Sequence, residues 1–258
     1  MANPQETPEA AAKRIFGKRA AYYVSSTTHT DPEVLARVAE LAGPDAEAIA
    51  LDIGTGTGHT AFALSPHVAR VIGLDLTPEM LVEAEKLRAE RSLSNVEFRT
   101  GDVRALPFEA GEFPRVTCRR AAHHFSDIHQ ALSEIRRVMS PGGRLVVDDR
   151  SVPEDDFVDA CMNELDFYHD ESHIREYRPS EWQTMLHQAG FEVEVVEPYI
   201  QHRPLTSLTD GVSEENVRKI HARFAGLKAE ERKKLNYVEE GIEIFTNHWY
   251  ITVAAVAR

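Results

Sequence analysis

The sequence predicts an α/β fold in which one mostly parallel β-sheet is covered by helices on both faces. Short apolar runs alternate with amphipathic helical segments along most of the chain, as in repeated βαβ units. The first strong apolar run, residues 48–53, leads directly into glycines, which is typical of a buried strand that turns sharply into a helix. Two late strands, separated by a helical stretch, favour an antiparallel strand at one edge of the sheet.

Four helices have clear start or stop signals. A Thr or Asp followed by proline marks three N-termini, because the cap side chain accepts a free backbone N–H and proline suits the first turn. A Pro-Gly-Gly run stops the fourth helix. The predicted helices are 8–21 with Thr7 as cap, Asp31 to about 42, 78 to about 91 with Thr77 as cap, and 127–139 before Pro141.

Seven strands are predicted, five of them before residue 150. Residues 113–118 form a weaker strand because Pro114 and Arg115 interrupt it. Residues 191–196 alternate strictly between apolar and polar, which suits an edge strand. The stretches between the late strands read as helical. The strands are 48–53, 71–75, 96–99, 113–118, 144–148, 191–196 and 249–256, and the helical stretches are about 151–188 and about 206–247.

Composition excludes several classes of protein. The chain has 258 residues and a formal net charge of −13, which disfavours binding to nucleic acid because phosphate backbones require clustered Lys and Arg. No apolar run is long enough for a membrane span, and residues 1–9 lack the apolar core of a signal peptide. The two cysteines, Cys118 and Cys161, lie far apart and show no metal-ligand spacing. We therefore expect a cytoplasmic protein without a membrane span, a nucleic-acid partner or a metal site.

The strongest chemical signal is a loop with glycines at 54, 56 and 58, between Leu51 and His59. Glycines there allow a tight turn and let a ligand approach the backbone closely. A dinucleotide-binding fingerprint would need its third glycine at position 59, where this chain has His59. The spacing therefore counts against a nicotinamide dinucleotide.

Asp75 ends the second predicted strand, about where a dinucleotide fold places its ribose-binding acid. A carboxylate at that point can accept hydrogen bonds from both hydroxyls of a ribose. The alternative is an exposed acid that caps the next helix, but Thr77 is expected to supply that cap. We therefore favour a ligand-binding role for Asp75.

A third motif, Thr100-Gly101-Asp102-Val103, follows the third predicted strand. By itself it is equally well explained as a turn-forming Gly-Asp pair. Its position beside the two other motifs, each at a strand end, favours a ligand-binding role.

Together these motifs resemble those of class I S-adenosylmethionine-dependent methyltransferases. The chain is similar to the methyltransferase family of ubiquinone and menaquinone biosynthesis and its bacterial relatives. The resemblance implies S-adenosyl-L-methionine as the cofactor and a Rossmann-like, seven-stranded, mostly parallel sheet with helices on both faces, an antiparallel last strand and a helical cap. It covers about residues 48–150, through the segments 51–59, 73–81, 100–108, 119–125 and 140–147.

The resemblance also implies an organisation and roles for single residues. We expect one domain with an N-terminal helical lid (1–45), a cofactor-binding core (46–150), a helical cap insertion (151–190) and C-terminal strands with a helical excursion (191–258). Asp52 is expected to hold the loop and the methionine amino group, and Asp102 to accept a hydrogen bond from the adenine amino group. The expected cofactor residues are Tyr23, His29, Asp52, Gly54, Thr55, Gly56, Gly58, Asp75, Leu76, Asp102, Val103 and, through its carbonyl, Arg119.

The candidates for acceptor chemistry are His123 and His124, just after the fourth predicted strand. Ligands of open α/β sheets bind beyond the carboxyl ends of the strands, and histidine exchanges a proton near neutral pH. The alternative is that one histidine packs under the cofactor and the other caps the next helix.

His173, Arg175 and Tyr177 are candidates for binding a polar or anionic acceptor. Arg175 can instead form a surface pair with Glu171, four residues earlier on a helix.

The favoured function is transfer of a methyl group from S-adenosylmethionine to a small-molecule acceptor by in-line displacement. The alternatives are an NAD-dependent oxidoreductase, against which His59 argues, and a non-catalytic module that binds S-adenosylmethionine. Either a monomer or a homodimer is compatible with the sequence.

Overall fold

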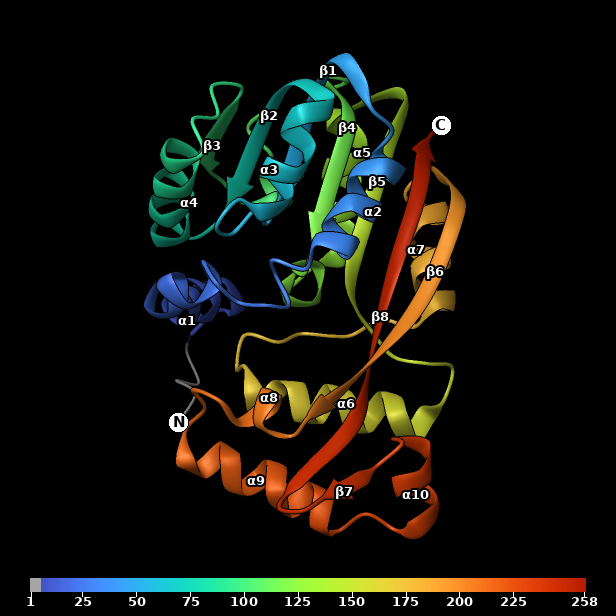
Figure 1. Ribbon diagram of the computed structural model, residues 1–258. Helices are drawn as coiled ribbons and strands as arrows, with labels where there is room; N and C mark the ends of the chain where they lie inside the picture. Colours follow the sequence, from blue (N-terminus) through green and yellow to red (C-terminus); the bar gives the residue numbers. More distant parts are fainter. Residues whose placement is uncertain (1–5) are drawn as a thin grey trace.

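A computed structural model of the protein describes residues 6–258 and contains one continuous sheet (Figure 1). Along the main path its strand order is β3-β2-β1-β4-β5-β8-β6, and β7 pairs only with β8. The first five strands are parallel, whereas β8 is antiparallel to both of its main neighbours. The strands are β1 (Asp45–Ile53), β2 (Val68–Asp75), β3 (Val96–Thr100), β4 (Phe113–Arg119), β5 (Met139–Ser151), β6 (Phe191–Pro204), β7 (Val238–Glu240) and β8 (Glu243–Ala257).

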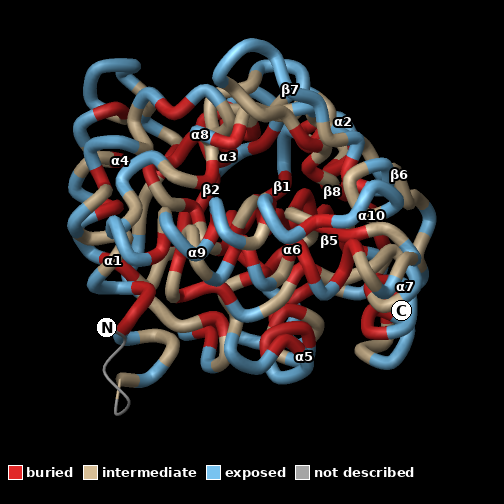
Figure 2. The backbone as a smooth tube through the Cα atoms, turned by 90° about the horizontal axis from the view of Figure 1, so that it is seen from below, coloured by how far each residue is buried: buried red, intermediate tan, exposed pale blue. Residues whose placement is uncertain are grey.

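Helices cover both faces of the sheet, which confirms the predicted α/β class. One face packs on α5 and α7, and the other packs on α2, α3 and part of α4. Burial follows this arrangement, because the strands are enclosed and the outer turns of the helices are exposed (Figure 2). The helices are α1 (Pro8–Tyr23), α2 (Pro32–Ala42), α3 (His59–Leu64), α4 (Pro78–Glu90), α5 (Ile128–Val138), α6 (Asp156–His169), α7 (Pro179–Gln188), α8 (Thr206–Thr209), α9 (Glu214–Ala225) and α10 (Ala229–Lys234).

Two of the predicted helix caps are confirmed and one is wrong. The Thr7 hydroxyl accepts the Ala10 N–H, and the Asp31 carboxylate accepts the N–H groups of the first turn of α2. The Thr77 side chain makes no capping hydrogen bond with α4. Asp75 instead accepts the Thr77 backbone N–H at 2.8 Å, so the acid rather than the threonine organises this turn.

The C-terminal strands differ most from the prediction. β6 and β8 extend well beyond 191–196 and 249–256, and they pair from Phe191–Ala257 to Pro204–Phe245. The antiparallel strand β8 lies between β5 and β6 rather than at the edge. The extra length carries β6 and β8 into a second layer of helices (Figure 1). There, buried polar residues such as His248 replace the expected apolar pattern.

This second layer, here called the cap, consists of α6, α8, α9 and α10 around the far ends of β6 and β8 (Figure 1). The predicted cap insertion 151–190 supplies only α6, because α7 packs on the sheet through Trp182, Met185 and Leu186. The stretch 206–247 supplies the other helices, together with the short strand β7. The cap has its own buried cluster, made of Val152, Val158, Cys161, Met162, Leu165, Leu205, Leu208, Ile220, Phe224, Leu227 and Leu235.

Candidate functional site

The glycine loop connects β1 to α3 and lies against the end of β2. Gly54, Gly56 and Gly58 all have positive φ, a conformation that favours glycine. A Cβ at Gly54 would lie 2.4 Å from the Cβ of Ala121, so a side chain there would close the space beside the loop. Gly58 instead packs against Phe62 and Phe98 at the start of α3. The first two glycines therefore form a cradle for a ligand, and the third lets the helix pack on the sheet.

Asp52 lies at the end of β1 and contacts this loop. Its buried carboxylate accepts hydrogen bonds from the hydroxyls of Thr55 at 2.6 Å and Thr117 at 2.7 Å. Burial raises the pKa of Asp52 to about 6, against the opposing effect of the two hydroxyls. Asp52 does not line a cavity, so its role in this structure is to fix the conformation of the loop.

Asp75 lies across the loop from Asp52. Its two oxygens accept the backbone N–H groups of Gly56 and Thr77, each at 2.8 Å. Burial raises the pKa of this carboxyl, and the backbone donors oppose that effect. A carboxylate has about four acceptor positions, so two remain for the hydroxyls of a ribose.

Asp102 follows β3 and faces the same space. Both of its oxygens accept hydrogen bonds from the Arg104 side chain, which holds the pKa of Asp102 below its ordinary value. Arg104 also pairs with Glu9 of α1 at 2.7 Å. This bridge ties the N-terminal helix over the ends of β3 and β4.

The segment after α1 is anchored to the core at several points. His59 donates through Nε2 to the carbonyl of Tyr23 at 3.2 Å, because a carbonyl can only accept. The buried guanidinium of Arg119 donates to the hydroxyl of Thr60 and to the carbonyl of His29. Tyr23 and His29 pack edge to face, with ring centroids 4.9 Å apart. His59, which replaces the third glycine of a dinucleotide fingerprint, thus helps to hold the segment after α1 in place.

These elements enclose one cavity, here called the loop cavity. Its lining includes the predicted cofactor residues except Asp52 and Gly58, and α1 closes one side of it, below the carboxyl ends of the strands in Figure 1. The cradle at Gly54 and the acceptor positions of Asp75 fit a nucleoside with an attached amino-acid chain. Among its lining residues are Tyr23, His29, Gly54, Thr55, Gly56, Asp75, Leu76, Asp102, Val103 and Arg119.

A second cavity of about 690 Å³, here called the cap cavity, lies between the sheet and the cap. Its walls come from α1, the turn at 122–124, the end of β5, α6, and residues 203–211. It shares part of its wall with the loop cavity, and a ligand in one therefore lies next to a ligand in the other. The shared residues are Phe16, Tyr23, His29, Arg120 and His124.

The two adjacent histidines differ in their environments. His123 is buried, and its Nδ1 lies 2.5 Å from the Asp149 carboxylate, which also accepts the His123 backbone N–H. Burial and the neighbouring His124 lower the pKa of His123 well below its ordinary value, so this ring is neutral. A neutral ring that donates through Nδ1 to Asp149 has its lone pair on Nε2.

His124 lines both cavities. Its Nδ1 lies 3.2 Å from the carbonyl of Ser172 and 3.1 Å from the Ser172 hydroxyl, and that hydroxyl donates to Asp170 at 2.7 Å. Both neighbours of Nδ1 therefore accept, so Nδ1 carries the proton. Among residues 6–258, Nε2 of His124 has no hydrogen-bond partner. In the neutral form of the ring the lone pair therefore lies on Nε2.

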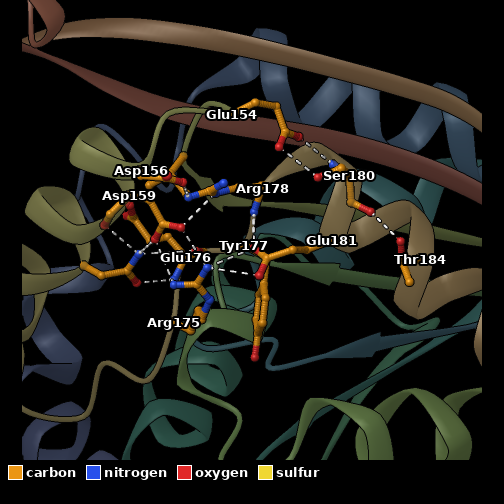
Figure 3. Close-up of polar contacts among 12 residues, drawn as sticks. Glu154, Asp156, Asp159, Arg175, Glu176, Tyr177, Arg178, Ser180, Glu181 and Thr184 are labelled. Carbon is orange, nitrogen blue, oxygen red and sulfur yellow. Dashed lines mark hydrogen bonds and ion pairs between the residues drawn. The ribbon is translucent and has the colours of Figure 1, made fainter.

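The three candidate acceptor residues lie in different places. His173 lines the cap cavity, where Nε2 contacts Asn163 at 3.0 Å and burial lowers its pKa to about 4. Arg175 and Tyr177 line neither cavity. Arg175 instead forms ion pairs with Asp159 and Glu181 (Figure 3), and Glu171 lies near Arg14 rather than Arg175.

Sequence reasoning missed several residues of the cap cavity. Four residues contribute to this cavity or to its histidines: Asp149, Arg120, Arg150 and Arg203. Arg120 lies within the family-like segment 119–125, and Asp149 lies near a strand end, which was a signal in the sequence. Arg150 and Arg203 belong to no recognisable motif. Among residues 6–258, no group of three or more His, Cys, Asp or Glu side chains is arranged to hold a metal ion.

The comparisons with known proteins agree with this geometry. A family described as "Methyltransferase domain" matches residues 51–147. The uncharacterized methyltransferase YcgJ of Bacillus subtilis (strain 168) is 42% identical over 171 residues, which cover 66% of this chain and 68% of that protein. A demethylmenaquinone methyltransferase of Thermus thermophilus is 42% identical over 113 residues, 43% of this chain and 51% of that protein.

Solved structures extend the likeness to nearly the whole chain. The crystal structure of the B. subtilis YcgJ protein has a TM-score of 0.83 at 32% identity, covering 88% of this chain and 98% of that one. Geranyl diphosphate C-methyltransferase of Streptomyces coelicolor A3(2) shares the fold, with a TM-score of 0.62 at 14% identity, covering 100% of this chain and 86% of that one. The chain therefore belongs to the class I S-adenosylmethionine-dependent methyltransferases, and its cofactor is S-adenosyl-L-methionine.

Proposed function

We propose that this methyltransferase transfers the methyl group to a small molecule held in the cap cavity. The observation that supports this proposal is the shared wall, at Phe16, Tyr23, His29, Arg120 and His124, between the cap cavity and the cavity that contains the cofactor motifs. A volume of about 690 Å³ lies in the range of small-ligand sites, which span roughly 300–1,000 Å³.

S-adenosylmethionine supplies an electrophilic methyl group on a sulfonium, which an acceptor atom displaces in line. The protein then contributes position and orientation. Asp75, the glycine loop and Asp102 hold the nucleoside side, and α1 excludes water over the loop cavity through Phe16 and Tyr23. Methyl transfer requires proton removal only if the acceptor atom carries a proton.

His124 is the proposed proton acceptor for such an atom. Its Nε2 lone pair is available, and Nδ1–H is held by Ser172, which keeps the ring oriented. His123 is proposed as a positioning residue, because Asp149 holds it in a buried position. Of the three acceptor-binding candidates, His173 remains in the proposal and the paired Arg175 does not.

A screen of small molecules with methyl-labelled S-adenosylmethionine tests the proposed function. We expect label to be transferred to at least one acceptor by the wild-type protein and not by Asp75→Ala, which loses cofactor binding. Label transfer only to proteins or nucleic acids would refute the small-molecule acceptor.

The role of His124 has its own test. His124→Gln is expected to lower kcat about a hundredfold or more, the usual contribution of a general base, while the Kd of S-adenosylhomocysteine stays within about threefold. His129→Gln, a change at an exposed position on α5, is the matched control. An equal loss of turnover and cofactor affinity in His124→Gln would point to a structural role instead.

The remaining expectations are also proposals. Cys118 and Cys161 are buried free thiols, which suits the reducing cytoplasm. No helix among residues 6–258 is long and apolar enough to cross a bilayer. The net charge of −13 disfavours a nucleic-acid partner. A monomer and a homodimer remain the two proposed states.

A further inference from the structure

Four arginines line the cap cavity, Arg19, Arg120, Arg150 and Arg203, and they differ in their partners. Arg120 pairs with the fully buried Asp148 at 3.1 Å, and Arg150 pairs with Asp166 and with Glu176. These two guanidinium groups are neutralised by carboxylates of the protein. Buried cations are ordinarily paired in this way, because an unpaired charge loses its solvation without compensation.

Arg19, on α1, donates to the carbonyl of Gly211 and has no carboxylate within ion-pair distance among residues 6–258. Arg203, at the end of β6, also lacks such a partner. Among the described residues its side chain makes one hydrogen bond, from Nη1 to the hydroxyl of Tyr250 at 3.1 Å. Among residues 6–258 no carboxylate lies within ion-pair distance of Arg203, and residues 1–5 contain no Asp or Glu. The side chain is partly buried in the cavity wall. It is a partly buried cation without a carboxylate partner among the described residues.

Ser207 lies four residues further along the chain, in α8, and lines the same cavity. Its hydroxyl is buried and has no hydrogen-bond partner among residues 6–258. A buried hydroxyl without a partner carries a free-energy penalty, so such a group ordinarily marks a place where a ligand or water completes the hydrogen bonds. Arg203 and Ser207 thus offer a charge and a hydroxyl from the same wall.

Neither Arg203 nor Ser207 lines the loop cavity, whereas His124 lines both cavities. The two donors therefore lie outside the wall that the two cavities share, and His124 lies within it. An acceptor that fills the cap cavity contacts both parts of this wall. The guanidinium fork matches the geometry of a carboxylate or a phosphate.

We infer that Arg203 and Ser207 form an oxyanion subsite, and that the methyl acceptor carries a carboxylate or phosphate group that binds there while its reacting atom lies at the His124 end. This inference rests on the proposed function, because it assigns the cap cavity to the acceptor. It makes Arg203 a specificity-determining residue that contacts the acceptor and not the cofactor.

Matched pairs of probes test the subsite. Benzoate against benzamide, and phenyl phosphate against phenol, are titrated by ligand-observed NMR into protein saturated with S-adenosylhomocysteine. We expect at least one anionic member to bind about tenfold or more tightly than its neutral partner, because a hydrogen bond to a charged group contributes at least that factor. The pair that shows the preference distinguishes a carboxylate from a phosphate site.

The preference should disappear in Arg203→Gln and weaken in Ser207→Ala. Arg218→Gln is the matched control, since Arg218 lies on α9 with an exposed side chain and does not line the cap cavity. Ser207→Ala removes one small hydroxyl without a partner, so it remains informative if Arg203→Gln folds poorly. A preference that survives Arg203→Gln, or the absence of preference in both pairs, would overturn the inference.

The same samples separate this inference from the proposed function. Binding of S-adenosylhomocysteine reports on the loop cavity alone. If that binding is intact and no anion preference is found, the subsite is wrong and methyl transfer to a neutral small molecule stands. If anionic acceptors bind through Arg203 but none receives labelled methyl in any screen, the subsite stands and the assignment of the cap cavity to the methyl acceptor is wrong.

Discussion

Replacing Gly54 with alanine should damage cofactor binding by an amount that the structure lets us estimate. Gly54 has φ of +64°, and a left-handed conformation costs a residue with a Cβ about 1–2 kcal/mol. The new Cβ would also lie 2.4 Å from the Cβ of Ala121, roughly 1 Å closer than the usual carbon–carbon contact. Overpacking of this kind costs about 1–3 kcal/mol. The sum is about 2–5 kcal/mol if the loop stays in place.

The loop can relieve this clash only by moving away from Ala121. Such a movement displaces the Gly56 N–H from Asp75, which now accepts it at 2.8 Å. We therefore expect the Kd of S-adenosylhomocysteine, measured by calorimetry, to rise at least about tenfold, which corresponds to about 1.4 kcal/mol. Urea denaturation measures the accompanying loss of stability.

Gly111→Ala is the matched control for this prediction. Gly111 has a similar φ of +76°, but a Cβ there would meet nothing within 4 Å. It should lose about 1–2 kcal/mol of stability and keep its cofactor affinity. The double variant Gly54→Ala/Ala121→Gly removes the clashing methyl. Gly54→Ala should therefore weaken cofactor binding less in the Ala121→Gly background than in the wild-type protein. Equal affinities for Gly54→Ala and Gly111→Ala would refute the steric argument.

Two further predictions concern Asp52 and Arg175. Burial raises the pKa of Asp52 from 3.8 to about 6, so the folded protein binds this proton more tightly and loses stability as the pH rises from about 4 to about 6. The free energy of unfolding in urea should therefore rise for Asp52→Asn relative to wild type across that range, by up to ~3 kcal/mol at the upper end. A difference that does not change with pH would contradict the raised pKa of Asp52. Arg175→Met should lower the thermal stability by about 1 kcal/mol or less, because the Arg175 side chain is one-third exposed. Asp159 also keeps its second partner, Arg178, at 2.8 Å. Turnover should be unchanged. A tenfold loss of turnover would instead return Arg175 to the acceptor site.

The parallel half of the sheet could be predicted from the sequence because its signals are local. Most of the first five strands are apolar or alternating runs bounded by turn residues, and the structure confirms all five in parallel, including the one that Pro114 and Arg115 interrupt. The C-terminal pair of strands, β6 and β8, could not be predicted in full. In its outer part Thr246 and His248 are buried polar residues that face the cap, so the apolar pattern of a strand is lost there. The three residues of β7 are all exposed and carry no such pattern.

The sequence was enough to predict the α/β class and the cofactor, and it placed the candidate cofactor motifs at strand ends. The motifs at Gly54, Asp75 and Asp102 follow successive strands, and parallel strands bring their carboxyl ends to one edge, so spacing along the chain predicts neighbourhood in space. The cap cavity was not predictable from the sequence. The cap cavity joins α1 to residues 203–211, almost 200 positions away, and whether an arginine such as Arg203 has a carboxylate partner depends on distances that no local pattern records.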